Sequence, residues 1–385
     1  MTDGMNQDAT ANQAMAERTG APFHVLLAGG GTGGHVFPAL AVAEELAARG
    51  WRVSFTGSAA GLEARLVGER GIPFHALPAR PLVGRNLLEK ARALTTLARS
   101  TAAAARLVRR IGADVVLGTG GYVSAPAVAG ARLARRPVLL LEPNAHAGVA
   151  NRWLSRWASG AAVGYRETIR DLKCPCWVTG VPVRAAFSSV PAELPPASAL
   201  QLLVLGGSQG AQQVNQAMAA LAAGLLDRLP ALRILHQAGA RNLEATREAY
   251  AAAGLGDHED RVEIVPFLDD VAGAMAASHL LVSRAGAITL AEICAAGRAS
   301  ILLPLSIAQG HQMDNARVLA DAGGAEVIAA ADLTPQLLGD RLAALLGDLP
   351  GLARMGRAAR ALARPRAAAD IADRLEMVAR AGGVR

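Results

Sequence analysis

The sequence predicts an α/β fold in which two doubly wound, Rossmann-like domains face each other across a cleft. The first indication is length, since 385 residues exceed the roughly 100–200 residues of one ordinary domain. The second is a pattern of short apolar runs alternating with amphipathic segments, which occurs twice along the chain. The third is a glycine-rich turn directly after the first strand of each run.

Composition supports buried parallel sheets. Hydrophobic residues make up 52% of the chain but aromatic residues only 3%, so aliphatic side chains must fill the cores. No apolar run approaches the ~20 residues of a membrane-spanning helix. Residues 1–21 lack the pattern of a signal peptide and are expected to be a disordered leader. The three cysteines, Cys174, Cys176 and Cys294, have neither disulfide nor zinc spacing, which favours a reducing cytoplasm.

The net charge is +7, which is compatible with nucleic acid, an anionic membrane surface or a phosphate-rich substrate. All but two of the 39 basic residues are arginine. Because alanine is also abundant, a coding bias explains part of the arginine count. The positions of the basic residues are therefore more informative about a partner than their number.

The predicted strands fall into two sets joined by a proline-rich linker. Residues 22–183 form the first domain, residues 184–199 the linker and residues 200–363 the second domain. The strands of the first domain are expected at 23–28, 52–56, 74–77, 114–117, 138–141 and 161–163. Those of the second are expected at 200–205, 233–236, 262–265, 280–282, 301–303 and 326–328. A last helix at about 352–380 has no following strand and fits either domain.

The first glycine turn, residues 29–34, precedes a helix predicted at 36–49. Such a turn exposes backbone amides at a helix N-terminus and suits an anionic or polyhydroxyl ligand, although a bare tight turn is the simpler alternative. Its glycines match the dinucleotide pattern G-x-G-x-x-G, which also requires a carboxylate at the end of strand two. Residues 55–58 there are Phe-Thr-Gly-Ser, so an NAD enzyme is disfavoured.

The second glycine turn, residues 206–210, precedes a helix from about Ala211. It lacks Gly-Lys-Ser/Thr and is therefore not a nucleoside-triphosphate P-loop. Its amides and the Ser208 hydroxyl can still hold a diphosphate without a metal. Both turns lie at carboxyl ends of strands, where open α/β sheets bind ligands.

Two further segments carry polar side chains after predicted strands. Residues 283–289, Ser-Arg-Ala-Gly-Ala-Ile-Thr, lead into a helix with Glu292, which suits two vicinal hydroxyls or simply complements the helix dipole. Beyond the next strand, His311, Gln312 and Asn315 are typical readers of sugar hydroxyls, but such clusters also occur on ordinary loops.

Seven motifs occur in the order and spacing of one family: GGGTGGHVFPALAVAEEL, GTGGYVSAP, EPNAHAGVANRWL, GVPVR, GGSQGAQ, SRAGAITLAEICAAG and GHQMDNA. From about residue 23 to 380 the chain resembles the MurG family of GT-B glycosyltransferases. The resemblance implies transfer of N-acetylglucosamine (GlcNAc) from UDP-GlcNAc to undecaprenyl-pyrophosphoryl-MurNAc-pentapeptide, which converts lipid I into lipid II in peptidoglycan synthesis. It also implies that the C-terminal helix, about 364–385, crosses back to the first domain.

The resemblance implies a donor site in the second domain. Ser208 and its loop would meet the diphosphate, the backbone at Leu268 the uracil, and Glu292 the ribose. The helix beginning at Ala287 would offset charge on the departing UDP. The remaining donor-binding positions are His311 and Gln312 for the GlcNAc hydroxyls and Arg184 for the nucleotide.

The same resemblance implies an inverting displacement that needs one base and neither a metal nor a cofactor. His35 is the candidate base, although it would alternatively bind the acceptor pyrophosphate or orient a hydroxyl. The acceptor-binding positions are Thr32, Gly33, Gly34, Tyr122, Glu142, Asn144 and Asn151, and Glu142 and Asn144 are expected to face the cleft. Two departures, Pro143 for the frequent glutamine and Val181 for the frequent asparagine, put amide contacts there in doubt.

Residues 81–110 are basic and amphipathic, which suits an anionic lipid surface or, alternatively, a solvated helix face. An acceptor with a polyprenyl chain favours the lipid surface and hence a peripheral protein on the cytoplasmic face of the bacterial inner membrane. Other cell-wall synthesis proteins are expected as further partners. Nucleic acid is not, since no aromatic cluster is present to stack bases.

Three alternatives remain open. A related GT-B enzyme acting on another lipid, such as diacylglycerol, would share the donor half but should lack the acceptor motifs. A non-hydrolysing sugar-nucleotide epimerase shares the fold but would need further acidic and basic residues in the cleft. An inactive membrane-bound scaffold would bind UDP-GlcNAc without transferring it.

Overall fold

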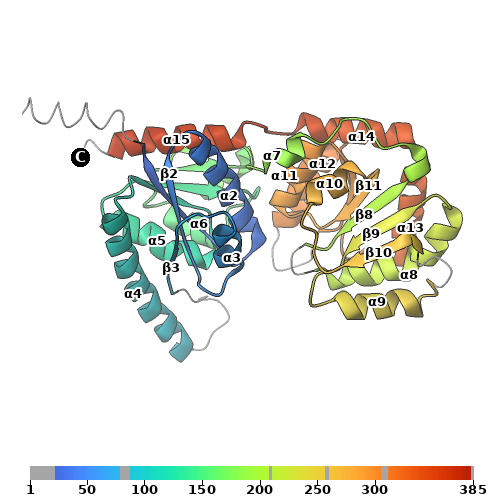
Figure 1. Cartoon of the computed structure of the whole chain (residues 1–385), viewed down its shortest axis with the longest axis horizontal. Coiled ribbons are helices and arrows are strands. Elements are labelled where there is room, and N and C mark those ends of the chain that lie inside the picture. The colour runs from blue at the N-terminus through green and yellow to red at the C-terminus, as the bar shows by residue number, and fades with distance from the viewer. Residues whose placement is uncertain (1–21, 79–86, 208–209, 256–259, 305–310, 383–385) are drawn as a thin grey trace, which may run out of the picture.

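The computed structural model describes residues 22–78, 87–207, 210–255, 260–304 and 311–382. The described chain forms two parallel sheets that lie side by side, each covered by helices on both faces (Figure 1). The predicted fold class is confirmed. The expected leader lies outside the described residues.

The N-terminal sheet has the order β3-β2-β1-β4-β5-β6-β7, and all its pairs are parallel. Its strands are β1 (His24–Ala28), β2 (Arg52–Gly57), β3 (Phe74–Ala76), β4 (Val115–Gly118), β5 (Val138–Glu142), β6 (Gly160–Val163) and β7 (Cys176–Val178). The sequence did not predict β7. This edge strand has only three residues and directly follows Pro175, so it carries little apolar signal.

Helices cover the N-terminal sheet in two groups. The first group is α2 (Gly33–Ala48), α3 (Leu62–Gly68) and the C-terminal α15 (Ala367–Gly382), and the second is α4 (Leu87–Ile111), α5 (Gly121–Leu133) and α6 (Val149–Leu154). Alternate residues of one strand point to opposite faces, so Leu27 packs under the first group and Leu26 under the second.

The C-terminal sheet repeats this plan in the order β10-β9-β8-β11-β12-β13. Its strands are β8 (Gln201–Leu205), β9 (Arg233–Gln237), β10 (Val262–Val265), β11 (Leu280–Ser283), β12 (Ala299–Leu302) and β13 (Ala325–Val327). Its helices are α8 (Gln212–Arg228), α9 (Leu243–Ala252), α10 (Val271–Ala276), α11 (Ala287–Ala296), α12 (His311–Asp321), α13 (Pro335–Leu346) and α14 (Leu349–Ala361). All twelve predicted strands of the two halves are present, with ends within two residues of those expected.

The prediction of one helix over 352–380 is wrong, because α14 ends at Ala361 and α15 begins at Ala367. Pro365 lies between them and cannot donate the hydrogen bond that a continuous helix requires. Beyond this break α15 crosses to the N-terminal half, where Ile371 and Leu375 are buried in its core (Figure 1). The expected return of the C-terminal helix to the first domain is confirmed.

The segment between the sheets contains α7 (Ala185–Ser188) and the short 3-10 helix η2 (Ala197–Ala199). The fully buried Arg298 binds it to the C-terminal half, since its guanidinium donates to the carbonyls of Pro191 and Glu193. The same guanidinium also donates to the carbonyl of Met275 at the end of α10. Charged hydrogen bonds of this kind offset the cost of burying the guanidinium.

Candidate active site between the two sheets

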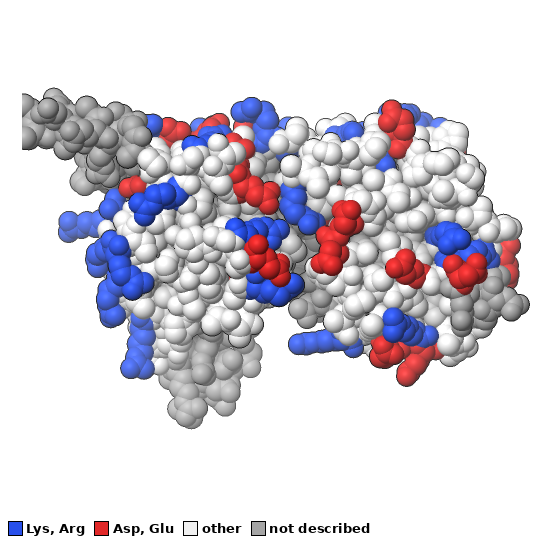
Figure 2. All heavy atoms as spheres, in the orientation of Figure 1, with Lys and Arg blue, Asp and Glu red and all other residues white. Residues whose placement is uncertain are grey.

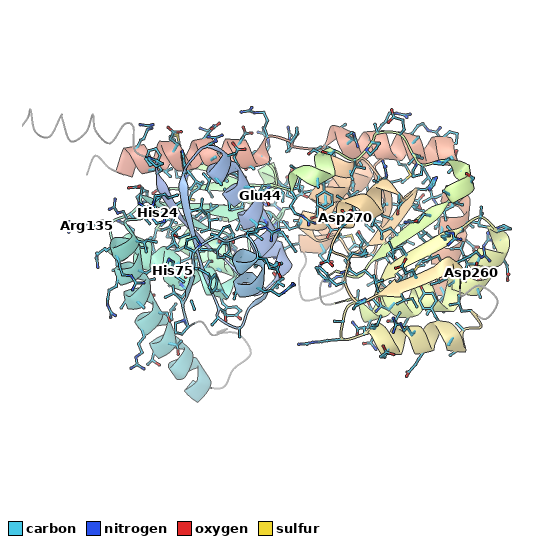
Figure 3. All side chains as sticks on the ribbon, in the orientation of Figure 1. His24, Glu44, His75, Arg135, Asp260 and Asp270 are labelled. Carbon is cyan, nitrogen blue, oxygen red and sulfur yellow. The ribbon has the colours of Figure 1, made fainter. Side chains whose placement is uncertain are left out.

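Polar side chains gather where the carboxyl ends of β1, β4 and β5 approach the C-terminal half. Direct contacts join the halves here: the Ala145 amide donates to Asn315 of α12, and Arg184 of the linker contacts both Phe37 of α2 and Glu292 of α11. In contrast, the labelled His24 lies at the amino end of β1, away from this edge (Figure 3). Its ring nitrogens lie 2.9 Å from Ser54 Oγ and the Ile111 carbonyl oxygen, so His24 has a structural role.

The first glycine turn is held by the side chain of Glu63, which the sequence did not predict as a site residue. Glu63 of α3 is 0% exposed and accepts hydrogen bonds from the amides of Gly31 (3.2 Å) and Ser58 (2.8 Å). Gly31 has φ +82°, which favours glycine, and the Tyr122 ring lies close to it. The turn therefore presents fewer bare amides than expected, because the Gly31 amide already has an acceptor. Thr32 follows as the exposed N-cap residue of α2, before Gly33 and Gly34.

His35 is held by the loop after β4. Its Nδ1 lies 2.8 Å from the Thr119 carbonyl, which only accepts, so Nδ1 carries the proton and Nε2 has the free lone pair. Gly120 and Gly121 pass so close that a Cβ on either would crowd the imidazole. Burial lowers the pKa of His35 against the opposing effects of Glu142 and the Thr119 carbonyl. The neutral ring that results at pH 7 is the form that accepts a proton.

Glu142, the last residue of β5, is only 2% exposed and organises the loop that follows it. Its Oε1 accepts from the backbone amide and the side-chain amide of Asn144, at 3.1 and 2.9 Å. Its Oε2 accepts from the Gly148 amide at 2.9 Å and from Asn151 Nδ2 at 3.0 Å. The expectation that Glu142 faces the cleft is not what the geometry shows, since its carboxylate is turned into its own loop. Asn144 does reach the other half, where its Oδ1 lies 3.4 Å from Asn315 Nδ2.

On the C-terminal side, Glu292 is buried in α11 and Arg184 Nη2 lies 3.7 Å from its Oε1. The Arg184 guanidinium also lies over the rings of Phe37 and Phe187, at 5.3 and 5.0 Å from their centroids. Burial raises the pKa of Glu292 to about 7, and Arg184 opposes this rise. The carboxyl is therefore poised between its two protonation states near neutral pH.

The helix α11 begins at the buried Ala287, directly after the turn that carries Arg284. Arg284 lines a cavity of about 290 Å³ together with Gly210 and Ala211 of the second glycine turn. The N-terminus of α8 and a guanidinium thus border one space, which favours an anion. The predicted Ser208 lies outside the described residues. The sequence had marked the small-residue turn beside Arg284 as a helix start that favours an anion, but Arg284 itself was not among the predicted donor-binding residues.

Three residues near the start of α12 continue the site. His311 begins the helix, Gln312 is buried one residue later, and Asn315 is fully buried. Asn315 Oδ1 accepts from the Ala145 amide at 2.9 Å, so it joins the loop after β5 to the donor side.

One predicted residue stands apart. Leu268 follows β10 and is partly buried against the core near α10. In the part of the chain that the structure describes, no group of three or more His, Cys, Asp or Glu side chains is arranged to hold a metal ion.

Comparison with known proteins agrees with this architecture. Residues 25–163 match the glycosyltransferase family 28 N-terminal domain, and residues 201–375 match the C-terminal domain of the same family. The chain is 42% identical to a UDP-N-acetylglucosamine–N-acetylmuramyl-(pentapeptide) pyrophosphoryl-undecaprenol N-acetylglucosamine transferase of Syntrophotalea carbinolica, covering 88% of this chain and 94% of the relative. It is 43% identical to the protein of that name from Halorhodospira halophila, covering 92% and 98%.

Among solved structures, MurG of Acinetobacter baumannii is 33% identical, with a TM-score of 0.72 over 92% of this chain and 100% of the other. A UDP-N-acetylglucosamine 2-epimerase structure from Listeria monocytogenes is only 15% identical, with a TM-score of 0.68 over 91% and 95%, and shares the fold alone. The chain belongs to glycosyltransferase family 28 and, within it, to the MurG family of N-acetylglucosaminyltransferases.

Proposed function

We propose that the chain transfers GlcNAc from UDP-GlcNAc to the 4-hydroxyl of the MurNAc unit of lipid I, which forms lipid II. The observation that supports this proposal is the meeting of the two halves at the Ala145–Asn315 contact, with the neutral His35 on the N-terminal side and Glu292 and the arginine-lined cavity on the C-terminal side. About 40% identity to transferases named for this reaction supports the same substrates.

The donor would occupy the C-terminal side. Glu292 would accept the ribose hydroxyls, with Arg184 beside it. The diphosphate would lie in the cavity bordered by Arg284 and by the start of α8. The helix α11 begins shortly after Arg284 in the chain. Helix N-termini and an arginine can stabilise the negative charge that develops on departing UDP, so we propose that the reaction needs no metal and no cofactor.

The acceptor would occupy the N-terminal side, between the first glycine turn and the loop after β5. The MurNAc hydroxyl oxygen attacks the anomeric carbon as the bond from that carbon to UDP breaks and UDP leaves with the electron pair. His35 Nε2 takes the hydroxyl proton, since Nδ1 is bound to the Thr119 carbonyl. A single displacement of this kind inverts the anomeric configuration.

An anionic membrane surface is the proposed setting for this reaction, at the cytoplasmic face of the inner membrane, with other cell-wall proteins as neighbours and no nucleic acid. In the described residues no helix is long and apolar enough to cross a membrane. The helices α4, α5 and α6 cover one face of the N-terminal sheet. Basic side chains lie along the left edge of the N-terminal half, where α4 runs (Figure 2).

On α6 and the turn after it, Trp153 and Trp157 are 61% and 44% exposed and pack edge to face. Arg152 and Arg156 lie beside them in sequence and are exposed. Exposed tryptophans next to arginines are typical of a membrane interface. Asn151 on the same helix is bound to Glu142, so this surface adjoins the proposed acceptor site.

The transfer reaction is tested directly by incubating the chain with lipid I in anionic vesicles and with labelled UDP-GlcNAc, UDP-GalNAc or UDP-glucose. We expect labelled lipid II with UDP-GlcNAc and much slower transfer with the other two donors. A His35→Gln variant should transfer at least about 100-fold more slowly with unchanged donor affinity, because it loses only the base.

Failure of the wild-type chain with every donor would contradict the proposed function. Transfer to diacylglycerol in place of lipid I would instead indicate the alternative lipid acceptor. Near-normal turnover of the His35→Gln variant would remove His35 from the role of base.

The raised pKa of Glu292 makes donor affinity depend on pH. Ribose hydroxyls donate to the carboxylate, so a protonated Glu292 must first lose its proton, and affinity should rise about tenfold from pH 6 to pH 8. Calorimetry with UDP-GlcNAc measures this, since its diphosphate does not titrate in that range. Glu292→Gln should abolish the pH dependence, and the exposed Glu263→Gln should keep it. A flat profile in the wild type would refute the ribose role.

The tryptophan pair on α6 should contribute to membrane binding. We expect the Trp153→Ala/Trp157→Ala double variant to sediment at least about tenfold less with vesicles containing anionic lipid, because it loses two interfacial anchors. The matched control is Phe267→Ala, which removes an exposed aromatic side chain from the C-terminal half. Equal sedimentation of the wild type and the double variant would rule out this surface.

A further inference from the structure

The loop after β5, residues 143–148, reaches the C-terminal half at a second point besides Asn315. His146 Nδ1 lies 3.2 Å from Asp171 Oδ2, and its Nε2 lies 3.2 Å from Asp314 Oδ2. Asp171 ends the 3-10 helix η1 (Arg166–Asp171) of the N-terminal half, whereas Asp314 lies in the first turn of α12. The imidazole of His146 therefore bridges one carboxylate from each half.

Further charged and titratable groups face this bridge from both sides. Arg170 Nη2 lies 3.0 Å from His146 Nε2, and Arg317 Nη1 lies 3.3 Å from Asp314 Oδ1. The ring of His311 has its centroid 6.1 Å from that of His146. The Asp171 carboxylate is fixed from its own half as well, because it accepts from the Ala147 amide at 2.9 Å.

The position of the bridge relates it to the reaction. Asp314 lies between Gln312 and Asn315 on one helical turn, and His146 directly follows Ala145, whose amide binds Asn315. The contact therefore joins the start of the donor helix to the loop that Glu142 organises on the acceptor side.

The bridge is poorly suited to a purely stabilising role. Between 20% and 35% of each of its three side chains is exposed, and contacts between side chains this exposed add little to the free energy of unfolding. The contact can affect the rate much more strongly than the stability, since a misplacement of reacting groups by about 1 Å can lower the rate by a factor of about 100.

We propose that His146 is a positioning residue, which sets the distance between the acceptor loop and the donor helix α12 through its contact with Asp314. The proposal rests on the transfer reaction proposed above. It concerns alignment of the two substrates, not the binding of either alone.

A double-mutant cycle of His146→Ala and Asp314→Ala tests the coupling. Each single variant should lower kcat about three- to tenfold, and the double variant should be no slower than the slower single variant. The affinity for UDP-GlcNAc, measured by calorimetry, should stay within about twofold in all of them. His146→Gln, which can still donate to Asp314, should restore part of the loss. Asp321→Ala, an exposed aspartate at the far end of α12, is the matched control.

Hydrogen exchange gives a readout that does not need turnover. In Asp314→Ala the amides of residues 144–150 should exchange several-fold faster, although the substitution lies in the other half, and Asp321→Ala should leave them unchanged. Wild-type kcat in the single variants, losses that multiply in the double variant, or unchanged exchange would each overturn the proposal. If the wild type transfers no sugar, the proposed function fails, and the exchange experiment still decides whether the bridge holds the loop.

Discussion

The carboxylate of Glu142 accepts four hydrogen bonds from the loop and helix that follow it, and the rest of the site depends on this arrangement. A carboxylate this deeply buried would be costly without such donors. Because the donors come from Asn144, Gly148 and Asn151, the Glu142 side chain holds both ends of the loop and the first residues of α6. The loop then has one shape to present to the other half.

Two consequences follow at the interface between the halves. The loop offers the Ala145 amide to Asn315 and the His146 ring to Asp314, so it meets α12 at two neighbouring points. Since only the segment around α7 and the crossing between α14 and α15 join the two sheets covalently, these contacts bear strongly on how the substrates are aligned. The Glu142 charge also acts on His35, where it opposes the effect of burial on the pKa.

The sequence predicted most of the fold, because buried parallel strands are continuous apolar runs separated by amphipathic helices. It missed β7, whose three residues carry too little apolar signal, and it merged α14 with α15, because the periodic pattern outweighed Pro365. The return of α15 to the first half was predicted only through the family resemblance. Nothing in the local pattern favoured either half.

The candidate site was predicted as a set of residues, but not how those residues are arranged. Glu63 beneath the first glycine turn and the bridge at His146 depend on segments brought together by tertiary packing, and no local motif marks such pairs. Glu142 was expected to face the cleft because it ends a strand, yet its own loop supplies its donors. The order of the parallel strands determines which side chains lie near one another at the edge of the sheet. The hydrogen bonds among the loops determine the orientation and partners of each of these side chains.

The most direct test of this account is a comparison of Glu142→Gln with the wild type, with transfer to lipid I and calorimetric affinity for UDP-GlcNAc measured on the same preparations. Transfer should fall at least about 100-fold while donor affinity stays within about twofold, because the loop loses its organising charge and the donor half is untouched. Near-normal transfer, or a donor affinity that falls in parallel with the rate, would contradict it.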